Sequence, residues 1–149
     1  MRAIIQRVES ASVRVDSQLI SKITKGILVF IGVGKEDTDK DADYVASKIM
    51  CMRIFDDNEG KMNLSLADIN GQALIVSQFT LFGDCRKGKR PSFESAADME
   101  KAKVLYEYLV EKCKQSNLVI GKGVFRENML VDLVNDGPVT ILLDSKKIF

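Results

Sequence analysis

One apolar run, residues 26–33, constrains the fold of this chain more than any other feature. The run is rich in β-branched residues, is bounded by glycines, and is too short to span a membrane as a helix. A strand whose two faces are both apolar belongs in the middle of a sheet, where both faces are covered. Residues 72–81 read as a second buried strand. The sequence therefore predicts a central β-sheet.

Two segments have helical periodicity instead. Apolar side chains recur at helical spacing from Ala42 to Met50, after an N-cap at Asp37-Thr38, and again from Ala102 to Cys113. The other predicted strands are 2–8, 11–15, 19–24, 117–125, 128–134 and 139–144. Two main helices among about eight strands predict an α+β or mixed α/β fold, organised around one sheet or open barrel. The length of 149 residues fits a single domain, 1–149.

The chain contains no histidine. This excludes Ser-His-Asp and Cys-His catalysis and most catalytic zinc sites. Its three cysteines are too few for a four-thiolate zinc site and are widely spaced, so we expect no metal, no cofactor and a reducing, cytoplasmic environment. The first residues lack the features of a signal peptide and are expected to be part of the fold, and no membrane helix is expected.

Positive charge is concentrated in one loop. The chain has 22 Lys+Arg and 21 Asp+Glu, a balance that argues against non-specific coating of nucleic acid. Nevertheless Arg86, Lys87, Lys89 and Arg90 lie within five positions and are followed by Phe93. Two interpretations are open: the loop binds phosphate groups, or it is a solvated loop without a ligand.

Hydroxyl and amide side chains gather where the second buried strand should end, at Ser77, Gln78 and Thr80. Such positions often carry functional groups, although the hydroxyls of a strand edge also serve to satisfy neighbouring backbone groups. As strand residues, Ser77 and Phe79 should face one side of the sheet, and Gln78 and Thr80 the other.

Residues 135–140 read as Asn-Asp-Gly-Pro-Val-Thr, and the simplest interpretation is a tight turn between two strands. The bond between Gly137 and Pro138 can also be cis at small cost, which would present rigid backbone carbonyls at a loop tip. Arg7 lies in an apolar stretch and needs a partner if it is buried. Phe125 and Met129 are either core residues or the wall of a ligand site.

Taken together, these segments resemble the D-aminoacyl-tRNA deacylase family, also called D-tyrosyl-tRNA deacylases, along essentially the whole chain. The pair Ser-Gln-Phe-Thr-Leu at 77–81 and Asn-Asp-Gly-Pro-Val-Thr at 135–140 is the most specific part of the match. The other matching segments are 1–8, 11–13, 60–65, 87–93 and 96–97. The sequence departs from the family at Arg126-Glu127-Asn128, where small residues are common.

The resemblance implies a homodimeric hydrolase that removes D-amino acids from tRNA, with its site at the subunit boundary. Gly137 and Pro138 match the Gly-cisPro motif, which enters the partner's pocket and excludes L-residues, and Arg7 matches the arginine that holds this motif. The residues matching the substrate pocket are Ser77, Gln78, Phe79 and Thr80, with Phe125 and Met129 also assigned to substrate binding. Lys87, Lys89 and Arg90 are assigned to tRNA binding.

Two mechanisms are open for such a site. Thr80 has been interpreted in the family as a nucleophile. The alternative has the backbone amides of Phe79 and Thr80 orient the ester while a ribose hydroxyl of the substrate assists. Without a nearby base, threonine is a poor nucleophile, so we favour the second route. The competing functional hypothesis is a non-catalytic RNA-binding module that uses the basic loop between Arg86 and Arg90.

Overall fold

The computed structural model describes residues 1–148 and is built around one long strand, β1 (Arg2–Val15). Along one edge, β1 pairs antiparallel first with β3 (Gly26–Gly32) and then with β2 (Gln18–Ile23). Along its other edge it pairs with β8 (Leu130–Asp144) over almost its whole length. The parallel strands β6 (Gln72–Ser77) and β7 (Ile120–Lys122) extend the sheet beyond β3. The order is therefore β2-β1-β3-β6-β7, with β8 on β1.

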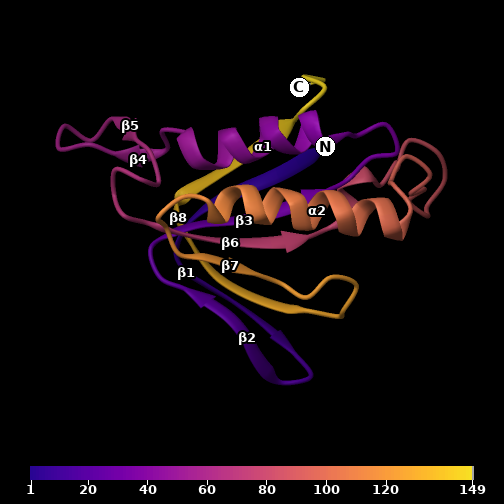
Figure 1. The fold of residues 1–149 in the computed structure, drawn as a ribbon, viewed down its shortest axis with the longest axis horizontal. Helices are drawn as coiled ribbons and strands as arrows, with labels where there is room; N and C mark the ends of the chain where they lie inside the picture. The colour runs from indigo at the N-terminus through magenta and orange to yellow at the C-terminus, as the bar shows by residue number, and fades with distance from the viewer. Residues whose placement is uncertain (149) are drawn as a thin grey trace.

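Two helices cover one face of this sheet. In Figure 1, α1 (Asp39–Cys51) and α2 (Met99–Lys114) lie side by side on the same face, while β2, the later part of β1 and the first part of β8 curl away from them. Ile27, Val29 and Ile31 of β3 pack beneath the helices, whereas Leu28 belongs to a second core enclosed by the curled strands. Both faces of β3 are thus covered, as the unbroken apolar run predicts.

The remaining elements are short. A hairpin of β4 (Phe55–Asp56) and β5 (Met62–Leu64) follows α1, and a 3-10 helix, Phe79–Phe82, follows β6. Residues 1–148 therefore contain two α-helices and eight strands, six of them in a nearly closed, barrel-like sheet and two in the separate β4–β5 hairpin, which confirms the predicted fold class. Within these residues no helix has the length and apolar character needed to cross a membrane.

Met1, Ser145 and Lys146 pack against the start of α1. The Met1 amino group is buried and lies 2.6 Å from the Asp37 carboxylate. Asp41 closes a capping box with Thr38 and also accepts hydrogen bonds from Ser145 and Lys146. Burial alone would raise the pKa of Asp41, but these hydrogen bonds, that of Lys146 foremost, lower it.

Several predicted strand boundaries are wrong. Segments 2–8 and 11–15 form the single strand β1, and 128–134 and 139–144 form the single strand β8. The turn predicted at 135–140 is instead a bulge, and the chain continues in the same direction beyond it. Of 117–125, only Ile120–Lys122 pairs as a strand, and the strand predicted over 72–81 ends at Ser77. These differences arise because strand length depends on pairing partners far away in the sequence.

Candidate active site

The first part of the site is the end of β6, where the chain leaves the sheet. The Gln78 N–H still donates to the Ile31 carbonyl at 2.7 Å, but the next backbone bond, from Leu81 N–H to the Gln78 carbonyl at 3.3 Å, belongs to a helical turn. The N–H groups of Phe79 and Thr80 precede that turn and have no acceptor within it. The predicted alternation of side chains over 77–80 is wrong, because the strand ends before it can continue.

A cavity of about 540 Å³ opens beside this strand end. Ser77, Gln78 and Phe79 lie on one side of it, and Phe125 and Met129 line it from the β7–β8 connection. The remaining lining residues are Ile31, Val33, Val76, Ala97, Met99, Ala102, Tyr106, Arg126, Glu127, Asn128 and Val131. The fold thus brings together five of the predicted site residues that lie far apart in the sequence.

Thr80 does not line the cavity but contacts a residue that does. The Gln78 side-chain amide donates a hydrogen bond to the Thr80 hydroxyl oxygen. An amide has no basic nitrogen, so this contact orients the hydroxyl without providing a group that could take its proton.

The inner wall of the cavity is aromatic. Tyr106 on α2 donates from its hydroxyl to the Ile75 carbonyl at 2.8 Å, and its ring lies 6.0 Å from that of Phe125. Burial raises the pKa of Tyr106, so its hydroxyl stays protonated as a donor. Sequence reasoning placed Tyr106 only in the apolar stripe of a helix. Nothing in that periodicity distinguishes a cavity wall from ordinary core.

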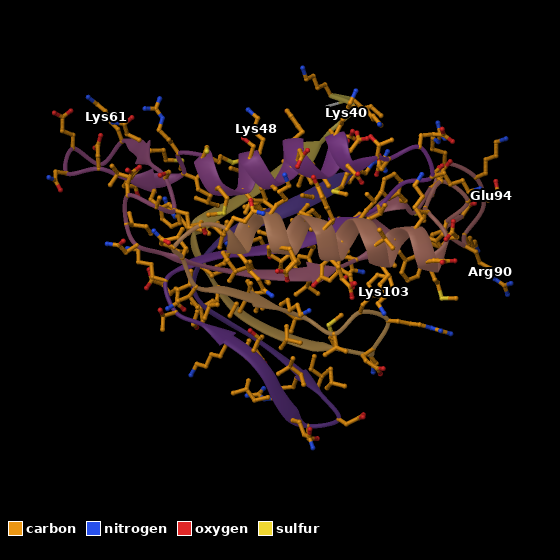
Figure 2. The ribbon with its side chains drawn as sticks, in the orientation of Figure 1. Lys40, Lys48, Lys61, Arg90, Glu94 and Lys103 are labelled. Atoms are coloured by element: carbon orange, nitrogen blue, oxygen red, sulfur yellow. The ribbon has the colours of Figure 1, made fainter. Side chains whose placement is uncertain are left out.

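The basic loop, defined here as residues 84–92, adjoins the cavity through aromatic contact. The rings of Phe79 and Phe93 meet edge to face with centroids 5.0 Å apart. Lys87, Lys89 and Arg90 are exposed, and Figure 2 shows Arg90 extending outward from the loop. Thus the structure places the predicted tRNA-binding cations beside the cavity and not inside it.

Part of the charge of this loop is neutralised internally. The Arg86 guanidinium lies 2.6 Å from the Asp84 carboxylate, and this contact lowers the pKa of Asp84 to about 2. The backbones of Asp84 and Ser92 exchange hydrogen bonds at the base of the loop. Among the four cations of this loop, Arg86 is therefore the one that forms an ion pair with a carboxylate of residues 1–148.

Gly137 and Pro138 lie in the bulge of β8, defined here as residues 136–139. Gln6 pairs with Thr140, whereas Val8 pairs with Asn135, so a single β1 residue faces the whole bulge. The Asn135 side-chain amide donates to the carbonyls of Arg7 (2.8 Å) and Val139 (3.1 Å). The peptide bond between Gly137 and Pro138 is cis, and both residues are exposed.

The β1 residue facing the bulge is Arg7, and its guanidinium is buried. Its Nη1 donates to the Ile54 carbonyl at 2.8 Å and lies 3.3 Å from the Asp56 carboxylate. Its Nε lies 3.0 Å from the Asp136 carboxylate, an ion pair without the alignment of a hydrogen bond. The partner that a buried Arg7 needs is thus the bulge itself, together with the start of the β4–β5 hairpin.

Within one chain the bulge and the cavity are separate. Arg7, Gly137 and Pro138 are absent from the cavity lining. Arg7 pairs with Ile27, whereas the cavity begins at Ile31, which at about 3.3 Å per residue lies roughly 13 Å further along β3. The residues predicted to bind the aminoacyl group therefore form two clusters, one at the cavity and one at the bulge. No group of three or more Cys, Asp or Glu in residues 1–148 is arranged to hold a metal ion.

These features define the class to which the protein belongs: a small α+β protein without histidine, whose cavity lies where the central parallel strands end. Residues 4–144 match the family model described as D-Tyr-tRNA(Tyr) deacylase. A D-aminoacyl-tRNA deacylase from Thermosipho melanesiensis is 61% identical over 150 residues, covering 100% of both chains. The chain therefore belongs to the D-Tyr-tRNA(Tyr) deacylase family, and the resemblance seen in the sequence is confirmed.

Solved structures support the fold. One, described as the c-Myc DNA Unwinding Element Binding Protein, superposes with a TM-score of 0.91 at 40% identity, covering 97% of this chain and 98% of that one. A second, described as a probable eukaryotic D-amino acid tRNA deacylase, gives a TM-score of 0.82 at 17% identity, covering 96% of this chain and 98% of that one. The latter likeness concerns the fold alone.

Proposed function

We propose that this protein hydrolyses the ester bond of D-aminoacyl-tRNA, releasing the D-amino acid and free tRNA, and that it rejects L-aminoacyl-tRNA. The observation that carries this proposal is a cavity that unites Ser77, Gln78 and Phe79 with Phe125 and Met129 in a chain of the deacylase family. Residues 1–149 act as one deacylase domain, and the expected location is the cytoplasm.

The cavity suits the 3′-terminal adenosine and its ester. Phe125, Met129 and Tyr106 offer aromatic and sulfur surfaces for a base. The N–H groups of Phe79 and Thr80 are available to hold the ester oxygen as negative charge develops on it. One such donor is worth about 2.7–4 kcal/mol in other hydrolases. An aminoacyl ester is already activated, so two backbone donors and an oriented ribose hydroxyl are sufficient.

The contacts of Thr80 support the substrate-assisted route. Its hydroxyl accepts a hydrogen bond from Gln78, and no histidine exists to remove its proton. A water molecule, assisted by the ribose 2′-hydroxyl, attacks the ester carbonyl. The bond between the carbonyl carbon and the ribose 3′-oxygen then breaks, and a proton from the water passes to that oxygen. We therefore expect Thr80→Ala to retain much of the kcat for D-Tyr-tRNA. Complete loss of activity in a folded Thr80→Ala variant that still binds tRNA would favour the covalent route.

Chirality is selected by exclusion. Attraction for a side chain discriminates weakly, since one methylene is worth only about 1–3 kcal/mol. A fixed backbone segment that occupies the space of an L-substituent rejects it whatever its size. The exposed tip at Gly137 and Pro138, tied to Arg7 and Asn135, is the segment that we assign to this role.

Because the bulge lies away from the cavity of its own chain, this role requires a second copy. We propose a homodimer in which each bulge enters the partner's cavity. Exposed aliphatic side chains flank the bulge along β8 and support such a contact, with Leu133, Val134 and Leu142 exposed to 36%, 57% and 59%.

The direct test compares the rates at which D-tyrosine and L-tyrosine are released from charged tRNA. Rapid release of D-tyrosine alone is expected, and equal rates, or none, would overturn the proposal. The non-catalytic alternative draws on the relative described as a DNA-binding protein and on the basic loop. It predicts salt-dependent RNA binding that is indifferent to the attached amino acid, with no release.

Mixed dimers test the exchange of bulges. One subunit carries an altered cavity and the other an altered Gly137. If bulges act across the dimer, the subunit with the intact cavity receives an intact bulge, so part of the selective activity returns on mixing. If each bulge serves its own chain, no selective site is restored.

A further inference from the structure

Arg126 has a backbone conformation that its residue type disfavours. It lies at the mouth of the cavity with φ of 71°, in a turn closed by the Glu127 N–H donating to the Val124 carbonyl at 3.3 Å. Glycine adopts this left-handed region readily, whereas a residue with a Cβ pays a conformational cost there. Residues held in such conformations cluster at functional sites, so the side chain of Arg126 warrants an explanation.

The Arg126 side chain is exposed and makes no ion pair or hydrogen bond to another side chain of residues 1–148. Four other arginines, in contrast, are paired with carboxylates: Arg2, Arg7, Arg14 and Arg86. Arg126 thus offers an uncompensated guanidinium at a ligand cavity.

Its position complements that of the basic loop. Arg126 belongs to the β7–β8 connection, whereas the basic loop reaches the cavity through Phe93 and Phe79. In Figure 1 both segments extend toward the same side of the molecule, with the first turn of α2 between them. A ligand that leaves the cavity mouth therefore passes between cations from two separate segments.

We propose that Arg126 binds a backbone phosphate of the single-stranded 3′ end of tRNA, next to the nucleoside held in the cavity. This inference rests on the proposed function. When the terminal adenosine occupies the cavity, the phosphate that joins it to the preceding nucleotide must lie near the mouth. A guanidinium fork matches phosphate oxygens in geometry as well as in charge. Arg126 is accordingly a substrate-positioning residue, not a catalytic one.

Glu127 provides a matched control of opposite sign. It is exposed, lines the same mouth and also lacks an ion pair in residues 1–148. Its carboxylate repels a phosphate, so removing it should not weaken binding. If Arg126 acts through phosphate, Arg126→Gln and Glu127→Gln change the affinity for tRNA in opposite directions.

The test compares two substrates, D-tyrosyl-tRNA and D-tyrosyl-adenosine, the second of which has no phosphate. Arg126→Gln should raise KM for the tRNA substrate about threefold to tenfold and leave KM for the nucleoside unchanged. Because one single-strand phosphate contact contributes about 0.7 to the slope of log affinity against log salt, that slope should become shallower by about this amount. Arg126→Gly, which suits the positive φ, should behave like Arg126→Gln without lowering the Tm.

Equal losses on both substrates would overturn the inference and assign Arg126 to the shape of the cavity. No change on either would overturn it as well. Binding of uncharged tRNA to the wild-type and Arg126→Gln proteins is measured in parallel. It reports on the phosphate contact even if the wild type releases no amino acid, so failure of this inference and failure of the proposed function remain distinguishable.

Discussion

The bulge of β8 and the basic loop both present a glycine in a left-handed conformation, yet their surroundings are opposite. At Gly137 (φ 117°) an added Cβ would meet Val139 Cγ2 at 2.8 Å and Arg7 Nη2 at 3.1 Å. At Gly88 (φ 70°) an added Cβ would meet nothing within 4 Å. The bulge is tied to β1, the strand with three neighbours, whereas the basic loop is held by contacts within itself.

This difference matches the two tasks that we assign to the regions. Steric exclusion fails if the excluding atoms move aside, so it requires a segment fixed by buried contacts. Attraction of phosphate by lysine and arginine falls off slowly with distance and tolerates movement. The rigid bulge is therefore suited to selecting the D-amino acid. The charged loop, which can act even when it moves, is suited to capturing the tRNA.

The largest effect is expected from Gly137→Ala. The added methyl group and the unfavourable φ displace the bulge, so the ratio of D- to L-tyrosine release should fall by about tenfold to a hundredfold, equivalent to about 1.4–2.7 kcal/mol. Gly88→Ala is the matched control and should leave this ratio unchanged. A Gly137→Ala protein with undiminished discrimination would remove the bulge from the selective machinery.

Arg7→Met should have the next largest effect. Methionine keeps a long, unbranched side chain at this position but removes the contacts with Ile54, Asp56 and Asp136, so we expect a loss of about 1–3 kcal/mol of unfolding free energy and reduced discrimination. Arg14→Met, in the same strand, removes only an exposed pair with Asp132 and should cost about 0–1 kcal/mol. Urea unfolding of the two variants measures the contrast. Equal losses of unfolding free energy in the two variants would contradict a special role for Arg7.

The third change removes charge from the basic loop. Lys87→Gln, Lys89→Gln and Arg90→Gln combined should raise KM for tRNA about tenfold and make its salt dependence shallower by up to about 2 in log–log slope. The D/L ratio should stay constant, because we assign tRNA capture and chiral selection to different regions. A change in that ratio with KM unaltered would reverse the assignment of the two regions.

The smallest effect is expected from Asp84→Asn. It frees Arg86 from its carboxylate, adding one available cation to the loop. Affinity for tRNA should rise about twofold to threefold, with a steeper salt dependence. Fluorescence anisotropy with labelled tRNA measures this. Weaker binding would show that the Asp84–Arg86 pair matters more for the shape of the loop than for its charge.

The fold and much of the site could be predicted because their signals are local. The apolar run at 26–33 indicated β3, and the helical spacing of Ala42 and Ala102 with their neighbours indicated both helices. The end of β6 at Ser77 could not be predicted, since residues 78–81 remain apolar enough to continue a strand. The pairing with β3, which itself ends at Gly32, does not extend beyond Ser77.

The bulge and the wall of the cavity depend on contacts between distant residues. Asn135 and Gly137 have the composition of a turn, and only the register against Gln6 and Val8 shows that the strand continues past them. Tyr106 has the periodicity of a core residue, and only the tertiary fold shows that it lines a cavity together with the β7–β8 connection. Neither fact is encoded in a short window of sequence.

The attachment of the bulge to β1 affects how the protein unfolds on heating. Because β1 pairs with β2, β3 and β8, the segment that carries Arg7 opens only when most of the sheet opens with it. The same opening dismantles the cavity beside β3. Heating should therefore abolish the bulge and the cavity of one chain together, in a single cooperative transition.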